Sequence, residues 1–233
     1  MRRKTAEMGP RREIAYPPEA WEQLRMLRNR ASEILEALHA RNIDGVVFGS
    51  VARGDVKPSS DVDIFIPSVV SSMQVAIALE HFNVLERSIV QATPRALVKA
   101  HLTLEDDKSV VFPLIPPRQT ELEFYKFGGE IGLDGLRSGQ RACGVDKRLM
   151  LIEPTPEGHI ETPLSDVSSG FAAKKIGVGQ AIVEERKRVL ERRADVGRTG
   201  IYLERQLGPD ESFEQVLNDL MIEDPAIRRR AST

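Results

Sequence analysis

Several features that mark other protein classes are scarce in this chain of 233 residues. A single cysteine, Cys143, excludes an internal disulfide and any zinc site built from cysteines, and fits a reducing compartment. The four histidines are scattered without the spacing of metal ligands. No apolar run approaches the roughly 18 residues that a membrane-spanning helix needs. The basic N-terminal segment lacks the apolar core of a secretory signal. We therefore expect a cytoplasmic protein that does not cross a membrane.

The chain also lacks a strong charge of either sign, because its formal net charge is −2. Any attraction to nucleic acid must therefore come from local basic patches. Hydrophobic residues make up 41% and charged residues 29%, which is typical of a globular protein with a buried core. The length allows a core domain with a smaller unit appended to it.

Apolar periodicity predicts a mixture of helices and strands. The helices are expected at 17–42, 72–84 and 93–102. The strands are expected at 43–49, 61–67, 87–93, 108–115 and 121–127, followed by a hairpin at 147–164. The segment 50–55 has room for one or two helical turns, and the pattern after Ser165 is helical. Because the later strands are antiparallel, with 108–115 and 121–127 read as a hairpin, we expect an α+β fold.

The sequence predicts three units along the chain. Residues 1–18 form a basic arm, mobile or loosely docked, 19–160 a main domain, and 165–233 a small helical domain. The composition shifts after Gly128 and Gly129, and the boundary before the last unit is expected between 155 and 168. The final residues 227–230 are expected to fray.

Two aspartates, Asp61 and Asp63, stand one residue apart at the start of an apolar strand. Residues two apart in a strand point to the same face, so the two carboxylates share a side while Val62, Ile64 and Ile66 face the core. Adjacent like charges resist burial unless something neutralises them. A divalent metal does so, and ligands with only oxygen donors favour Mg²⁺ or Mn²⁺ over zinc. The pair is also compatible with an exposed acidic start of a strand.

A glycine-serine pair precedes the aspartates. Gly49 lets the backbone approach a bulky anion, and Ser50 offers a hydroxyl together with the amides of a short helical turn. Arg53 lies three residues on, where we expect it to reach the terminal phosphate of a nucleoside triphosphate. Carboxylates for a metal beside a loop for phosphate are the layout of phosphoryl or nucleotidyl transfer.

The stretch GSVARGDVKPSSDVDIFI, residues 49–66, resembles the signature of the DNA polymerase β-like nucleotidyltransferase superfamily. The stretch has the three parts of this signature, namely Gly-Ser, a spacer at 51–60 and Asp-x-Asp at the start of a strand. It is similar to the corresponding stretch of minimal nucleotidyltransferases and of tRNA CCA-adding enzymes. The resemblance covers residues 43–127. It implies a palm-like mixed sheet and metal-dependent transfer of a nucleotide.

The resemblance also implies roles for individual residues. Asp61 and Asp63 would hold metal ions against the triphosphate, and Ser50 would bind the departing pyrophosphate. Ser60, the last residue of the spacer, joins Gly49, Ser50 and Arg53 as a candidate for nucleotide binding.

Members of this superfamily use a third acidic residue on a neighbouring strand, because two metal ions about 4 Å apart need more than two carboxylates. The segment 121–127, expected as a strand, offers Glu121 and Glu123 on one face. The family pattern places the catalytic group second, which favours Glu123, with Glu121 as the alternative. The family more commonly has an aspartate at this position, and a glutamate side chain is longer by one methylene group. Either side chain is also compatible with a solvated strand face.

Residues 170–190 resemble a helix-turn-helix. Small Ala173 lets two helices approach, and Gly177 supplies the turn. Gly179 departs from the pattern, because a Ser or Thr cap is expected there. The segment 194–206 is expected to follow as a wing-like turn and strand.

Basic side chains in this segment favour binding of nucleic acid, namely Lys187, Arg188, Arg192, Arg193 and Arg198. Glu184 and Glu185 lie early on the second helix and would repel phosphates. They favour a helical packing or dimerisation module instead.

These patterns support one leading hypothesis and two others. The leading hypothesis is Mg²⁺-dependent transfer of a nucleoside monophosphate, with ATP as the first candidate donor, to a hydroxyl on RNA or on protein. In the second, an inactive nucleotidyltransferase fold acts as a regulator that binds RNA or DNA through the C-terminal unit. The third is a sensor that binds ATP without turnover. The paired carboxylates favour the enzyme, because an inactive fold has no physical need for them.

Overall fold

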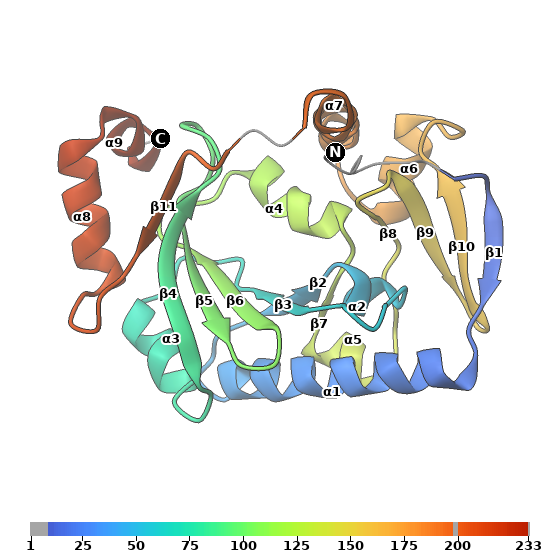
Figure 1. Cartoon of the computed structure of the whole chain (residues 1–233), viewed down its shortest axis with the longest axis horizontal. Coiled ribbons are helices and arrows are strands. Elements are labelled where there is room, and N and C mark those ends of the chain that lie inside the picture. Colours follow the sequence, from blue (N-terminus) through green and yellow to red (C-terminus); the bar gives the residue numbers. More distant parts are fainter. Residues whose placement is uncertain (1–8, 198–199, 233) are drawn as a thin grey trace.

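The computed structural model describes residues 9–197 and 200–232, except for the side chains of 193–196. Within these residues the chain forms two separate β-sheets, and one long helix runs beneath both of them (Figure 1). This helix, α1 at Pro18–His39, begins at a proline and buries apolar residues at helical spacing. No helix in the described part of the chain is long and apolar enough to cross a membrane.

The larger sheet has the strand order β11-β4-β5-β6-β3-β2-β7. Its strands are β2 Val46–Phe48, β3 Val62–Phe65, β4 Val84–Gln91, β5 Lys99–Leu104, β6 Lys108–Pro113, β7 Glu130–Gly132 and β11 Leu203–Gln206. The pair β3 and β6 is parallel, and the other neighbouring pairs are antiparallel. A mixed sheet combined with helices confirms the α+β prediction.

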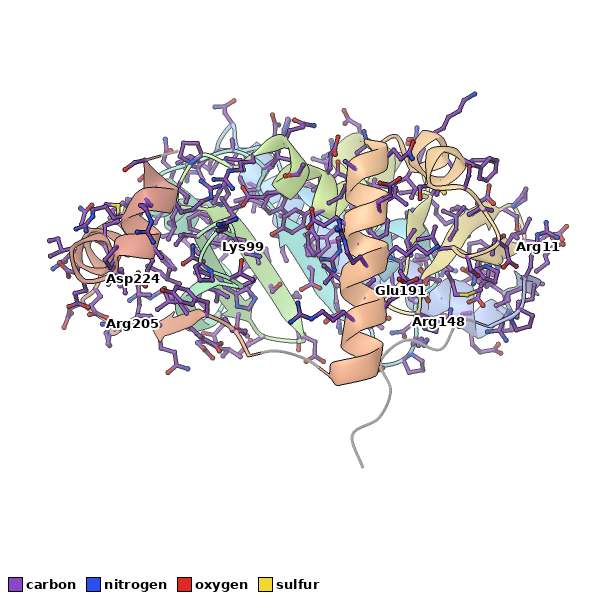
Figure 2. The ribbon with its side chains drawn as sticks, turned by 90° about the horizontal axis from the view of Figure 1, so that it is seen from above. Arg11, Lys99, Arg148, Glu191, Arg205 and Asp224 are labelled. Carbon is purple, nitrogen blue, oxygen red and sulfur yellow. The ribbon has the colours of Figure 1, made fainter. Side chains whose placement is uncertain are left out.

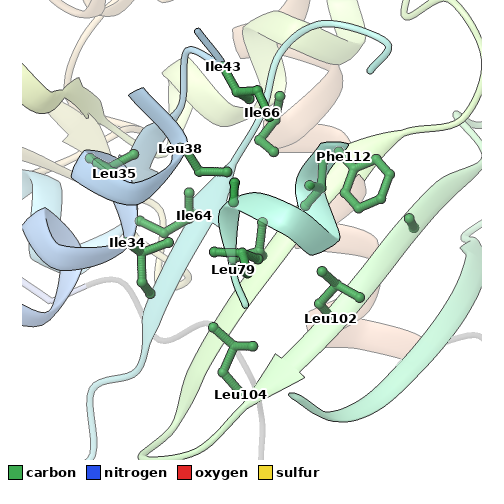
Figure 3. Packing of buried hydrophobic residues seen from close by; sticks show 14 of the residues in the cluster. Ile34, Leu35, Leu38, Ile43, Ile64, Ile66, Leu79, Leu102, Leu104 and Phe112 are labelled. Carbon is green, nitrogen blue, oxygen red and sulfur yellow. The ribbon is translucent and has the colours of Figure 1, made fainter. Parts of the chain in front are cut away.

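One face of this sheet carries the main hydrophobic core (Figure 3). Leu35 and Leu38 from α1 pack there with Ile64 of β3 and Phe112 of β6, each at most 2% exposed. Burying one such side chain contributes about 1.5–3 kcal/mol. The other helices that contribute to this core are α2 Ser50–Arg53, α3 Ser72–Ala78, α5 Leu133–Arg137, α8 Phe213–Glu223 and α9 Pro225–Ala231.

The opposite face of the larger sheet is covered only in part. Helix α4, Gln119–Phe127, lays Tyr125 on Phe65 of β3, with the two rings stacked 3.5 Å apart between centroids. Asp63 lies on this same face, because side chains alternate along β3 and its neighbours Val62 and Ile64 are buried in the core. This face positions the candidate site.

The smaller sheet has the order β1-β10-β9-β8, with antiparallel neighbours throughout. Its strands are β1 Arg12–Ala15, β8 Gly144–Val145, β9 Met150–Thr155 and β10 Gly158–Pro163. The helices α6 Ser169–Ile176 and α7 Gln180–Val196 share a second hydrophobic core with this sheet. The hairpin predicted at 147–164 is confirmed as β9 and β10.

Two predicted elements are wrong. Residues 93–102 do not form a helix: a turn leads into β5, where alternate residues are buried. Residues 121–127 are not a strand but belong to α4, whose first turn is closed by a hydrogen bond from the Arg118 amide to Glu121. Leu122 and Tyr125, three residues apart, both face the sheet. Short apolar runs satisfy a period of 2 or 3.6 equally well, which explains the error.

The chain after Ser165 divides between the two cores, where the sequence predicts one appended unit. Helices α6 and α7 pack on the smaller sheet. Strand β11, predicted to belong to a wing, pairs instead with β4 at the edge of the larger sheet. Arg230, in the segment expected to fray, is only 3% exposed. Part of the predicted N-terminal arm is likewise strand β1, while residues 1–8 lie outside the described part of the chain.

Candidate functional site

The register between β2 and β3 brings the two motifs together. Phe48 lies opposite Asp63, so the chain that leaves β2 through Gly49 and Ser50 passes the start of β3 and Asp61. Antiparallel neighbours lie about 5 Å apart. Residues 49–50 and 61–63, separated in sequence by the spacer, therefore line one edge of the site.

The turn after β2 requires glycine. Gly49 has φ 79 and ψ −143, a conformation that residues with a Cβ rarely adopt. Its amide donates to the carbonyl of Gly129 (2.9 Å), which ties the turn to the start of β7. A Cβ at Gly49 would meet no atom within 4 Å, so the backbone conformation rather than crowding selects glycine.

The two serines predicted to bind nucleotide lie together. The hydroxyl of Ser50 donates to that of Ser60 (3.2 Å), and Ser60 also accepts a hydrogen bond from the amide of Lys57 (2.9 Å). These bonds close the spacer loop against α2. The two serines thus lie together, one at the start of α2 and the other directly before Asp61.

Arg53 has contacts different from those that the sequence predicts. Arg53 is buried, with 6% of its surface exposed. Its guanidinium donates a hydrogen bond to the Gly128 carbonyl (2.5 Å) and forms an ion pair with Asp55 (2.9 Å). Its aliphatic part lies where a Cβ on Gly129 would be. Here Arg53 braces the 128–129 turn, which holds Gly49, instead of extending toward a terminal phosphate.

Burial raises the pKa of Asp63 above its ordinary value, and the charge of Asp61 adds to this effect. Ser109 opposes it by donating a hydrogen bond of 2.6 Å to Asp63 Oδ1, and Lys147 and His101 oppose it by their charges. No lysine or arginine in the described part of the chain forms an ion pair with Asp63.

The predicted third carboxylates lie elsewhere. Glu123 accepts a hydrogen bond from the Gly179 amide (3.2 Å) ahead of α7, and Glu121 pairs with Arg230 (2.6 Å). Among the described residues, no group of three or more His, Cys, Asp or Glu side chains could hold a metal ion. Both glutamates belong to a helix and not to a neighbouring strand, and neither joins the aspartates in such a group, so a third carboxylate at the aspartates stays a prediction.

The neighbouring strand presents a serine instead. In the parallel pair β3–β6, Asp63 lies opposite Ser109, and Ser109 lies opposite Thr103 of β5. The same face of β5 carries Lys99 and His101. Sequence reasoning missed these residues, although the polar-apolar alternation at 99–104 signals a strand with one polar face.

Asp61 and Asp63 fit a hard divalent cation. Mg²⁺ is commonly bound by one or two carboxylates together with phosphate oxygens of the substrate. The oxygen-only set of Asp61, Asp63 and Ser109 suits one such ion. A second ion would need a further carboxylate, which the described residues do not bring to this place.

The basic residues of α7 are only partly described. Arg188 and Arg192 are exposed and Lys187 is half-buried. The side chain of Arg193 and the whole of Arg198 lie outside the described residues. Glu184, Glu185 and Glu191 are exposed on the same helix, so its surface mixes both signs of charge.

Residues 28–122 match the family model of the nucleotidyltransferase domain. The match contains β2, the turn at Gly49 and Ser50, both aspartates and β6, and it supports a transferase that moves nucleotidyl groups. It also supports the resemblance to the polymerase β-like superfamily. No curated protein and no solved structure matches the chain significantly. The matched residues contain strands β2 to β6 of the larger sheet and end within α4.

Proposed function

We propose that the protein transfers a nucleoside monophosphate from a nucleoside triphosphate, with ATP as the first candidate, to a hydroxyl of RNA or protein. One observation carries the proposal: Asp63 lies opposite Phe48 beside the Gly49 turn, close to Asp61, and no lysine or arginine in the described part of the chain forms an ion pair with it. A divalent ion with a triphosphate supplies that missing charge.

The chain's own residues have distinct tasks in this reaction. Asp61 and Asp63 would hold Mg²⁺ or Mn²⁺, which would neutralise the phosphates and polarise the reacting oxygens. Ser50 and Ser60 would donate hydrogen bonds to the departing pyrophosphate. The acceptor oxygen would bond to the α-phosphorus as the bond to the β-phosphate bridge breaks, pyrophosphate would leave, and the proton of the acceptor hydroxyl would pass to water. Positioning and charge neutralisation would then provide the catalysis.

One observation favours a second candidate function, an inactive nucleotidyltransferase fold that binds nucleic acid as a regulator. Ser109 stands opposite Asp63, and neither Glu121 nor Glu123 joins the aspartates. The helix-turn-helix resemblance also points this way, since Gly177 adopts the left-handed conformation (φ 79) between α6 and α7. Nucleic-acid contacts by Lys187, Arg188 and Arg192 would belong to this function.

The decisive experiment uses purified protein with Mg²⁺, total RNA and a cell lysate, and ATP labelled at the α-phosphate. A parallel reaction carries ATP labelled at the γ-phosphate, and Asp61→Asn is the control. Label transferred from the α position alone, and lost in the variant, establishes nucleotidyl transfer and identifies the acceptor. If none of the four nucleotides labels any acceptor with Mg²⁺ or Mn²⁺, the regulator replaces the enzyme as the better explanation.

A further inference from the structure

The turn between β8 and β9, residues 146–149, brings a lysine of the smaller sheet to the aspartates of the larger one. Burial raises the pKa of Asp63, and the charge of Lys147 on this turn opposes the rise. Charges more than about 10 Å apart are largely screened at 0.1 M salt. The exposed ammonium of Lys147 therefore belongs to the surroundings of the candidate site, although its turn connects strands of the other sheet.

The turn that carries Lys147 has a defined backbone. Asp146 Oδ1 accepts hydrogen bonds from the amides of Arg148 (2.8 Å) and Met150 (3.0 Å), and Oδ2 accepts one from Arg148 Nε (2.6 Å). The Leu149 amide donates to the Asp146 carbonyl (3.1 Å), and Leu149 adopts a left-handed φ of 64. The carboxylate of Asp146 thus closes the turn, as aspartates commonly do, and the Lys147 side chain is left exposed.

Close backbone packing places this turn beside the Gly49 loop. Gly144, three residues before Lys147, packs so tightly on the 128–129 turn that a Cβ on it would lie 2.5 Å from the Gly129 amide nitrogen. The Gly129 carbonyl in turn accepts the hydrogen bond from Gly49. Three residues of extended chain span at most about 11 Å, and a lysine adds a flexible four-carbon stem. Lys147 is therefore within reach of a phosphate held at the Gly49 loop.

Two other basic side chains near the site are paired or neutral. Arg53, which the sequence predicts to contact a terminal phosphate, is buried and forms an ion pair with Asp55. Burial lowers the pKa of His101, so its ring is neutral at pH 7. Lys147 forms no ion pair with a carboxylate in the described part of the chain. Its ammonium is therefore available to an anionic ligand.

The direction of the proposed displacement decides which reactant Lys147 would meet. The leaving oxygen and the attacking oxygen lie roughly in line, on opposite sides of the phosphorus. The strand order places β2 with the Gly49 loop on one side of Asp63, and β6 and β5 on the other. Because the Gly49 loop is the proposed place of the pyrophosphate, the acceptor hydroxyl would approach over β6 and β5.

The β8–β9 turn lies on the pyrophosphate side of the site. Its packing on the 128–129 turn, through Gly144, joins it to the Gly49 loop. Seen from above, Arg148, which follows Lys147, and Lys99 of β5 lie on opposite sides of α7 (Figure 2). Lys147 is thus placed to meet the phosphates of a nucleoside triphosphate and not the acceptor.

We propose that Lys147 binds the β- and γ-phosphates of the nucleoside triphosphate, so that the smaller sheet supplies a cation to the phosphate site. The position of the triphosphate rests on the proposed function, whereas binding of the nucleotide does not require transfer. A lysine ammonium carries three donors, and its charge-assisted hydrogen bonds to phosphate are roughly twice as strong as neutral ones.

The test measures the binding of ATP, AMP and inorganic tripolyphosphate to the full chain by isothermal titration calorimetry, in Mg²⁺ and without an acceptor. Lys147→Met removes the ammonium and keeps an unbranched side chain, and Lys147→Arg restores the charge. The matched control is Lys174→Met, which removes an exposed lysine from α6. Thermal unfolding checks that all three variants fold.

We expect Lys147→Met to bind ATP and tripolyphosphate at least about tenfold more weakly, because one hydrogen bond to a charged group is lost. Its affinity for AMP should stay within about twofold of the wild type. Lys147→Arg should recover most of the affinity for ATP, and Lys174→Met should bind as the wild type does. Unchanged affinity of Lys147→Met for ATP overturns the proposal. Equal weakening of ATP and AMP also overturns it, because the contact would then not be with the β- and γ-phosphates.

The transfer assay separates this inference from the proposed function. Transfer by the wild type, with unchanged ATP affinity in Lys147→Met, refutes the role of Lys147 alone. ATP binding that depends on Lys147, without transfer to any acceptor, refutes the enzyme and leaves Lys147 in a nucleotide-binding site. A wild-type protein that binds neither ATP nor tripolyphosphate refutes both.

Discussion

The two sheets surround a carboxylate in opposite ways: Glu161 of the smaller sheet is buried, and Asp63 of the larger sheet is half-buried. In the smaller sheet Glu161, with a side chain 4% exposed, accepts hydrogen bonds from Arg148 (2.5 Å) and Arg12 (2.7 Å) and lies 3.3 Å from His159 Nε2. Burial alone would raise the pKa of Glu161, but these bonds outweigh it and lower the pKa to about 2.

In the larger sheet, Asp63 accepts a hydrogen bond from the neutral hydroxyl of Ser109, and burial raises its pKa. Glu161 thus has arginine partners in ion-pair contact, whereas Asp63 has none in the described part of the chain, and we expect a ligand to supply its counter-charge. We expect a carboxylate of the first kind to stabilise the fold, and one of the second kind to serve function at a cost in stability.

The sharpest test of this contrast is Asp63→Asn. Transfer from α-labelled ATP should fall by about 10³-fold or more, because the metal loses a ligand. The free energy of unfolding should stay equal or rise by up to about 1 kcal/mol, because the repulsion from Asp61 is removed. Urea unfolding and the labelling assay measure the two effects. A destabilised variant that retains transfer would reverse the assignment.

Glu161→Gln should behave in the opposite way. Loss of the charge that pairs with Arg148 and Arg12 should lower the free energy of unfolding at pH 7 by about 2–3 kcal/mol. Transfer per folded molecule should be unchanged, because Glu161 lies in the other sheet. Urea unfolding compared with the wild type checks the first value. A variant as stable as the wild type would show that the network is not a stabilising one.

The stabilisation that is lost in Glu161→Gln should depend on pH. The pKa of Glu161 is lowered by folding, so its contribution is complete above the unfolded value of about 4.5 and is lost as the pH falls toward about 2. The difference in unfolding free energy between wild type and Glu161→Gln should therefore shrink from pH 7 to pH 3. Urea titrations at a series of pH values test this, and a constant difference would contradict it.

The smallest effect is expected for Ser109→Ala. Asp63 loses the hydrogen bond of 2.6 Å, which costs about 1 kcal/mol of stability and raises the pKa of Asp63 further. Transfer should fall by about tenfold or less. Thr103→Val on the neighbouring strand removes a hydroxyl from the same face and serves as the matched control. Equal losses of transfer in both variants would show that the bond to Asp63 is not the cause.

The local pattern of apolar residues was sufficient to predict much of the larger sheet. The period of 2 places Asp61 and Asp63 on one face, and Val62, Ile64 and Ile66 are buried as predicted. The spacing of apolar residues predicts α1 correctly. Such features follow from the geometry of one strand or one helix. The roles of the aspartates, of Gly49 and of the two serines stay predictions until transfer is measured.

The secondary structure of short amphipathic segments could not be predicted from the local pattern of apolar residues. Residues 121–127 satisfy both periods, and the structure forms a helix there that packs Tyr125 on Phe65 and is closed at its first turn by Glu121.

The sequence by itself determined that two carboxylates share a face beside a glycine turn, because backbone periodicity and the φ of Gly49 are local properties. Only the tertiary structure decided which side chains meet them. The parallel pairing of β6 with β3 sets Ser109 against Asp63, the pairing of β11 with β4 carries the C-terminal helices back to the larger sheet, and Arg230 joins α9 to Glu121 of α4. These contacts join residues far apart in the chain, and their partners are selected by burial of the whole core and not by any local signal.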